Sequence, residues 1–175
     1  TDTEETLFGG EEKVESITDI TSLFNMNVLT TTDKTVEKNS NLQITSLAID
    51  YFTENLYIGT THGEVIHINV QDRENPFLQE RVKVSDEPVT SLGFLLGDVS
   101  IVVGDREGDI STWMRVRDET SQSGWSLKKV HPAKPHQTGI TSIASSSRNK
   151  CYVTAASDGT IQLKHATSEQ TLLNL

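Results

Sequence analysis

The sequence predicts an all-β protein built from repeated units of four antiparallel strands. Three stretches share one alternation of apolar and polar residues with short turns between, which is typical of half-buried strands joined by hairpins. These stretches are residues 44–68, 89–113 and 140–163. A repeat of about 40–50 residues that holds several short strands is typical of a β-propeller, in which each repeat forms one sheet, or blade.

Recurring landmarks indicate that the three stretches are copies of one unit. A threonine opens each copy and a glycine lies in its tight turn, namely Thr45, Thr90, Thr141 and Gly63, Gly108, Gly159. Both sets are separated by 45 and then by 51 residues, so the extra residues fall between units. An outer strand is expected after each copy, in residues 77–84, 125–130 and 171–175.

The chain length limits the number of blades. A closed propeller has about 4–8 blades, whereas 175 residues hold three clear units and one degenerate unit at most. We expect a partial propeller that forms a single domain over residues 1–175, and that is either a fragment or closes with another copy. The expected blades are residues 1–41 (degenerate), 42–76, 77–124 and 125–175.

Charge and motifs exclude several function classes. A net charge of −10 repels polyanions, so nucleic acid is not an expected partner. No G-x-S-x-G elbow and no glycine-rich phosphate loop occurs in the sequence, which predicts a domain that is not an enzyme and has no catalytic or cofactor-binding residues.

Two segments contain residue types that can bind metal ions, but the spacing of their side chains argues against a metal site in either. His62 and His67 lie five residues apart in one hairpin, which places their side chains on opposite faces of a regular strand. The carboxylates of residues 105–109 end after five positions, whereas a calcium loop spaces its oxygen ligands over about twelve. The second segment is expected to be a solvated hairpin turn, and no metal site is predicted.

The third unit, PHQTGITSIA to VTAASDGTIQLKH, resembles a WD40 repeat. His136 precedes the inner strand by four residues and Asp158 lies in the hairpin turn. The resemblance implies that His136, Thr154 and Asp158 form a buried hydrogen-bonded set that holds the blade together. The Trp-Asp pair that gives the family its name is replaced here by Lys164 and His165.

The other two units keep fewer of these landmarks. The second has Trp113, but Glu107 stands at the turn and Ser85 at the histidine position. The first has Ile68, His62 and Ser40 at the three positions. The predicted blades are therefore WD40-like in geometry and weak in signature residues.

Residues 131–139 are expected to form an irregular loop on one rim of the propeller. This segment, HPAKPHQTG, holds two prolines and a glycine, which disfavour a regular strand. Exposed loops carry binding residues more often than the strands beneath them. The candidate rim contacts are His131, Lys134 and Arg106.

A weak WD40-like unit followed by HATSEQTLL, within residues 140–173, resembles the propeller domain of bacterial phosphate ABC transporter permease subunits of the PstC type. The resemblance implies a non-catalytic interaction or regulatory domain on the periplasmic side of the bacterial inner membrane. This segment would be soluble although its parent chain lies in the membrane. Its partners would be other transporter subunits or the periplasmic phosphate-binding protein.

Two alternatives stay open alongside the permease. One is a soluble WD40-type scaffold of a cytosolic assembly, and the other is a propeller hydrolase with a metal in its channel. In all three cases the unpaired strand edges of an open propeller favour pairing with another chain. We therefore expect a homo-oligomer that forms through exposed blade edges.

Overall fold

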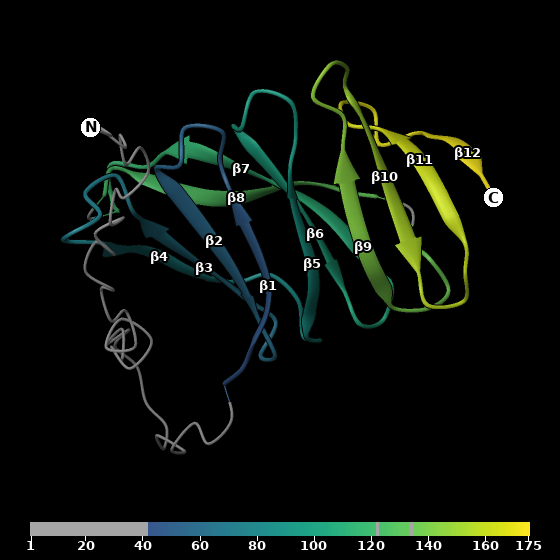
Figure 1. Cartoon of the computed structure of the whole chain (residues 1–175), viewed down its shortest axis with the longest axis horizontal. Helices are drawn as coiled ribbons and strands as arrows, with labels where there is room; N and C mark the ends of the chain where they lie inside the picture. Colours follow the sequence, from purple (N-terminus) through teal and green to yellow (C-terminus); the bar gives the residue numbers. More distant parts are fainter. Residues whose placement is uncertain (1–41, 122, 134) are drawn as a thin grey trace, which may run out of the picture.

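The computed structural model describes residues 42–121, 123–133 and 135–175. Their regular secondary structure consists entirely of β-strands, arranged in three antiparallel sheets of four strands each (Figure 1). The predicted all-β fold with four-stranded blades is confirmed. The degenerate unit expected at residues 1–41 lies outside the described residues. In the described part, no helix is long and apolar enough to cross a membrane.

Each sheet follows the chain in order from an inner to an outer strand. The first sheet contains β1 (Ile44–Ile49), β2 (Asn55–Thr60), β3 (Glu64–Asn69) and β4 (Phe77–Lys83). The second contains β5 (Val89–Phe94), β6 (Ser100–Asp105), β7 (Ile110–Arg117) and β8 (Trp125–Pro132). The third contains β9 (Ile140–Ser145), β10 (Cys151–Ala156), β11 (Ile161–His165) and β12 (Thr171–Asn174).

The structure corrects the predicted boundaries between blades. The sequence pattern places the outer strands of residues 77–84 and 125–130 in the second and third units, yet β4 pairs with β3 and β8 pairs with β7. Each outer strand follows its neighbour through a loop, so antiparallel pairing brings it back to the same sheet. The crossing to the next sheet occurs later, between β4 and β5 and between β8 and β9.

The three predicted turn glycines occupy equivalent positions in the structure. Gly63, Gly108 and Gly159 have φ angles of 68°, 101° and 87°, in the left-handed region that glycine adopts without a Cβ penalty. They lie in the hairpins β2–β3, β6–β7 and β10–β11. The shared conformation explains why the same residue recurs at one place in each unit.

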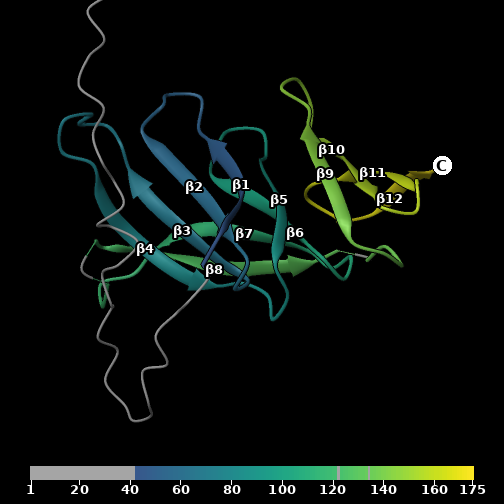
Figure 2. The same ribbon diagram turned by 60° about the horizontal axis from the view of Figure 1, so that its bottom comes forward.

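The sheets lie side by side in an open arc, with the first and third at its ends (Figures 1 and 2). One apolar core lies between the first and second sheets, where Tyr57 and Val65 pack against Leu92, Val103 and Trp113. A second core lies between the second and third sheets and includes Val102, Ile110, Ile140 and Tyr152. A third cluster, formed by Ile58, Ile66 and Ile68, belongs to the first sheet alone. Two of the three buried apolar clusters of the described residues therefore lie between neighbouring sheets.

Candidate functional site

The structure joins the three residues predicted to hold the third sheet together. The His136 ring lies 2.8 Å (Nε2) from the Thr154 hydroxyl and 2.9 Å (Nδ1) from the Thr160 hydroxyl. Thr160 donates in turn to the Asp158 carboxylate at 2.7 Å. Asp158 thus reaches His136 through Thr160, and because Asp158 is exposed, the expectation of a buried set is wrong for this residue. Sequence reasoning missed this link, although a threonine two residues after the turn aspartate is a usual hydrogen-bonding partner.

Lys164 replaces the tryptophan of this set. It lies 51 residues after Trp113 and is fully buried, with its ammonium 3.3 Å from the Thr171 hydroxyl. Burial, and then the nearby Lys164 charge, lower the pKa of His136, which keeps the ring neutral at neutral pH. A neutral imidazole has one donor and one acceptor nitrogen, which suits its position between two hydroxyl groups.

In the second sheet, the β6–β7 turn is held by Asp105, which lies earlier in its hairpin than Asp158 does in the third sheet. Asp105 is 4 % exposed and accepts a hydrogen bond from the Ser85 hydroxyl at 2.6 Å. Its other oxygen accepts from the backbone N–H groups of Glu107, Gly108 and Asp109 at 2.9–3.0 Å. The expectation of a solvated turn is therefore wrong for Asp105, because its carboxylate replaces water as the acceptor for three backbone donors.

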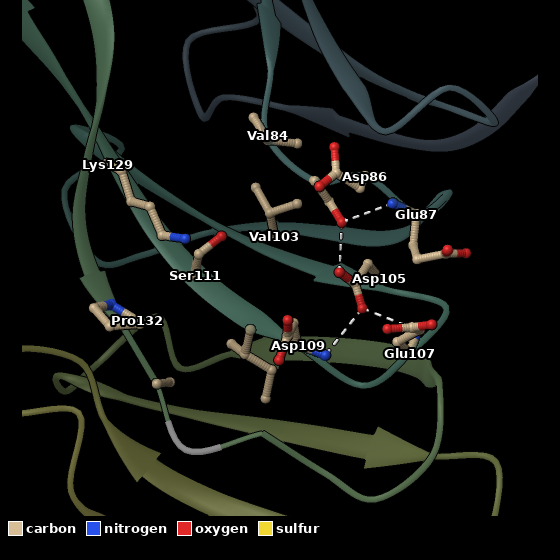
Figure 3. Close-up of a pocket in the computed structure, with 13 residues that line it drawn as sticks. Val84, Asp86, Glu87, Val103, Asp105, Glu107, Asp109, Ser111, Lys129 and Pro132 are labelled. Carbon is tan, nitrogen blue, oxygen red and sulfur yellow. Dashed lines mark hydrogen bonds between the residues drawn. The ribbon is translucent and has the colours of Figure 1, made fainter.

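A cleft of about 340 Å³ opens beside Asp105, where the β4–β5 linker faces the β6–β7 hairpin and the end of β8 (Figure 3). Among the described residues, five carboxylates and one cationic side chain, Lys129, line it. The acids are Asp86, Glu87, Asp105, Glu107 and Asp109. Such a concentration of negative charge disfavours phosphate and other anions at this place. Four donors form hydrogen bonds to the Asp105 carboxylate. These bonds hold the β6–β7 turn and occupy the oxygens that a general base would need.

A second buried polar cluster lies in the first sheet, where His67 stacks on Tyr57 with ring centroids 4.3 Å apart. Its Nε2 lies 2.9 Å from Oδ1 of Asn55, whose amide donates to Asp50 at 2.6 Å. Arg115 of the second sheet donates to the same Asn55 oxygen at 3.4 Å. Burial, and then the Arg115 charge, lower the pKa of His67 from 6.5 to about 3, so the ring is neutral.

The two predicted rim contacts that the structure describes, Arg106 and His131, lie in different parts of the second sheet. Arg106 lies exposed in the β6–β7 turn, where its backbone N–H bonds to Pro88. His131 is exposed on β8 and lines a pocket between the second and third sheets, together with Leu96 and Lys150. The irregular loop expected at residues 131–139 therefore begins later than predicted, because β8 extends to Pro132. Lys134 lies outside the described residues. Among the described residues no group of three or more His, Cys, Asp or Glu side chains is arranged to hold a metal ion.

The β1–β2 and β5–β6 turns lie side by side on one rim (Figure 1). They carry exposed apolar residues that the sequence reasoning did not identify. Tyr51 and Phe52, in the first turn, are 83 % and 70 % exposed, and Leu96 and Val99, in the second, are also exposed. The Tyr51 N–H donates to the Asp98 carboxylate at 3.0 Å, which holds the two turns together. We call these four apolar residues the apolar rim patch.

Comparison with known proteins assigns the fold. No protein-family model and no curated protein matches the sequence. Solved structures do match it, among them the RRP9 WD40 repeats, with a TM-score of 0.65 and 12 % identity over 79 % of this chain. The chain has a WD40-like β-propeller fold. It spans 40 % of the length of that RRP9 chain.

Two further solved structures match this chain in fold. A chain of the mitotic checkpoint complex matches with a TM-score of 0.64 and 16 % identity, over 79 % of this chain and 39 % of that one. The computationally designed Ika4 protein matches with a TM-score of 0.60 and 22 % identity, over 79 % of this chain and 75 % of that one. These likenesses establish the WD40-like fold and give no link to a phosphate transporter permease.

Proposed function

We propose that this WD40-like chain is a non-catalytic protein-interaction domain that binds a partner protein through the apolar rim patch. The observation that carries the proposal is the exposure of four large apolar side chains on two adjoining turns. Exposed apolar clusters of this kind mark protein-interaction sites, because burying them on a partner removes apolar surface from water. Structural neighbours that are WD40 repeat proteins support the general role.

The chemistry of the patch indicates the kind of partner. Tyr51 and Phe52 pack edge to face with ring centroids 5.4 Å apart, and aromatic side chains supply much of the energy at protein interfaces. Asp98 and Glu54 lie in the same two turns, and the whole chain carries a net charge of −10. The partner we propose is a protein with an apolar pocket framed by lysine or arginine, since like charges would repel it.

A photo-crosslinking amino acid at position 51 tests this proposal in the organism that makes the protein. We expect covalent adducts with one partner protein, identified by mass spectrometry, and a lower yield in the Phe52→Ser background. The same probe at Thr120, an exposed residue of the β7–β8 loop, is the matched control. Equal adducts at both positions, or none at position 51, would refute the role of the patch.

The narrower prediction of a periplasmic phosphate-permease domain rests on the sequence resemblance of residues 140–173 alone and remains a prediction. Hydrophobic spans of about 20 residues flanking this segment in the full reading frame would support it, whereas a soluble flank would favour a cytosolic scaffold. Metal analysis of the purified protein tests the propeller-hydrolase alternative, which requires a stoichiometric metal ion.

A further inference from the structure

The cleft beside Asp105 lies where the third sheet holds a histidine ring. Ser85 has the position in the second sheet that His136 has in the third, 51 residues later in the chain. The His136 ring is buried between the hydroxyl groups of Thr154 and Thr160. Ser85 reaches Asp105 at 2.6 Å, but its side chain is too short to fill the place of a ring.

The two positions that contact this ring in the third sheet line the cleft in the second. Val103 holds the position of Thr154. Asp109 holds that of Thr160, and both side chains lie in the wall of the cleft (Figure 3). Its volume of about 340 Å³ falls within the range of about 300–1,000 Å³ that is usual for ligand sites. A planar group with ring nitrogens fits this place in one sheet, and the second sheet leaves it open.

A buried hydroxyl group in the cleft has hydrogen-bonding capacity left. Ser111 lines the cleft and is 8 % exposed, and its oxygen accepts the indole N–H of Trp113 at 2.8 Å. A hydroxyl group has a second lone pair and a proton to donate. In the part of the chain that the structure describes, Ser111 uses neither of them in a further side-chain hydrogen bond. Buried polar groups are normally satisfied, so a ligand with polar atoms would complete this site.

The charge of the cleft selects a cation with several donors. The β4–β5 linker supplies Asp86 and Glu87, and these face the β6–β7 hairpin across the cleft (Figure 3). The hairpin supplies Glu107 and Asp109, which are exposed and form no ion pair within the described residues. A guanidinium group carries five N–H donors in one plane and keeps its charge at every physiological pH, whereas a lysine ammonium is compact and strongly hydrated. Arginine therefore suits carboxylates that approach from two sides.

We propose that this cleft binds an arginine side chain of a partner protein. The guanidinium group takes the place that the His136 ring has in the third sheet. It donates to the carboxylates of Glu107 and Asp109 and to the remaining lone pair of Ser111. Strand β6 runs from the β5–β6 turn to the β6–β7 hairpin, so the cleft and the apolar rim patch lie at opposite ends of one strand. The inference adds a second binding surface and does not depend on the proposed function.

Titration of the whole chain with the peptide acetyl-Gly-Arg-Gly-amide, followed by backbone amide chemical shifts, tests the proposal. We expect the shifts to be confined to residues 84–87 and 105–111. The same peptide with citrulline in place of arginine has nearly the same shape and no charge, and it should bind about tenfold more weakly or worse. The lysine peptide should bind with intermediate affinity, because it has the charge without the planar set of donors.

Two variants of the cleft act in different ways. Glu107→Gln combined with Asp109→Asn removes two charges from exposed side chains and should weaken binding of the arginine peptide by about tenfold. Glu119→Gln removes an exposed acid of the β7–β8 loop and is the matched control, with binding like that of the wild type. Ser85→His places a ring in the cleft, as His136 does in the third sheet, and should abolish binding. Circular dichroism and thermal unfolding establish that each variant is folded.

Four results would each overturn the proposal. They are the absence of saturable binding of the arginine peptide, equal binding of the citrulline or lysine peptide, shifts that centre outside the cleft, and a double variant that binds like Glu119→Gln. None of these results bears on crosslinking at position 51, so failure of this inference is distinct from failure of the proposed function.

Discussion

Thr112 of β7 donates a hydrogen bond of 2.6 Å to the carboxylate of Glu169, which lies between β11 and β12. Tyr152, a buried residue of β10, donates to the other oxygen of this carboxylate. One side chain from a surface turn thus connects the second and third sheets by accepting from both. Burial, and then the hydrogen bond to Glu169, raise the pKa of Tyr152, which keeps its hydroxyl protonated as a donor.

Glu169→Ala should lower the free energy of unfolding by about 2–3 kcal/mol, because it leaves the buried Tyr152 hydroxyl without an acceptor. Urea denaturation followed by tryptophan fluorescence measures this loss. Thr112→Val removes only one of the two bonds and should cost less. Glu119→Ala, at an exposed acid of the β7–β8 loop, is the control and should be neutral. A Glu169→Ala variant as stable as this control would contradict the assignment.

His67 should make stability depend on pH. Its pKa is about 3 in the folded protein, below the ordinary 6.5, so the unfolded chain binds a proton that the folded chain excludes. The resulting stability is complete above pH 6.5 and is lost as pH falls toward 3, by at most about 1.4 kcal/mol per pH unit. Denaturation at several pH values measures it.

The matched variant for this experiment is His67→Phe, which keeps a ring against Tyr57 and does not titrate. Glu80 acts in the opposite direction, since burial raises its pKa. The difference between wild type and variant at each pH therefore isolates the histidine. Parallel curves for the two proteins between pH 6.5 and 3 would show that His67 is not the cause.

Thr154→Val should destabilise the third sheet by about 1–2 kcal/mol, because valine has the shape of threonine but offers the His136 ring no hydroxyl. Thermal unfolding and amide hydrogen exchange in β10 measure the effect. Thr45→Val replaces an exposed threonine of β1 and serves as the control. If both variants unfold alike, the His136 contact contributes nothing to stability.

The turn acids of the second and third sheets should differ in importance. Asp105→Ala should cost about 3 kcal/mol, because it leaves three backbone N–H groups and the Ser85 hydroxyl without their acceptor. Asp158→Ala should cost clearly less, since Asp158 is exposed and water can replace it. Comparison of the two denaturation midpoints is the measurement. Equal losses would mean that burial does not decide the contribution of a turn carboxylate.

The strands and hairpins could be predicted because their determinants are local. Alternating side chains and the glycines at 63, 108 and 159 act within a few residues of themselves, so the sequence pattern fixes where strands turn. The blade boundaries at residues 77 and 125 could not be found in this way. Which sheet an outer strand joins depends on its hydrogen-bonded neighbour, and no residue inside β4 or β8 encodes that choice.

The sequence alone determined the three repeated units and their turns, since these depend on spacing within one unit, whereas the association of His136, Thr154 and Asp158 was implied by the resemblance to a WD40 repeat. The tertiary structure decided the burial of Asp105, the meeting of Tyr51 with Asp98, and the exposure of Ile161. Ile110 and Ile161 are the same residue at the same position of a blade, yet one is buried and the other is exposed. The reason is physical: burial is set by the sheet that packs against a face, and that sheet belongs to another part of the chain.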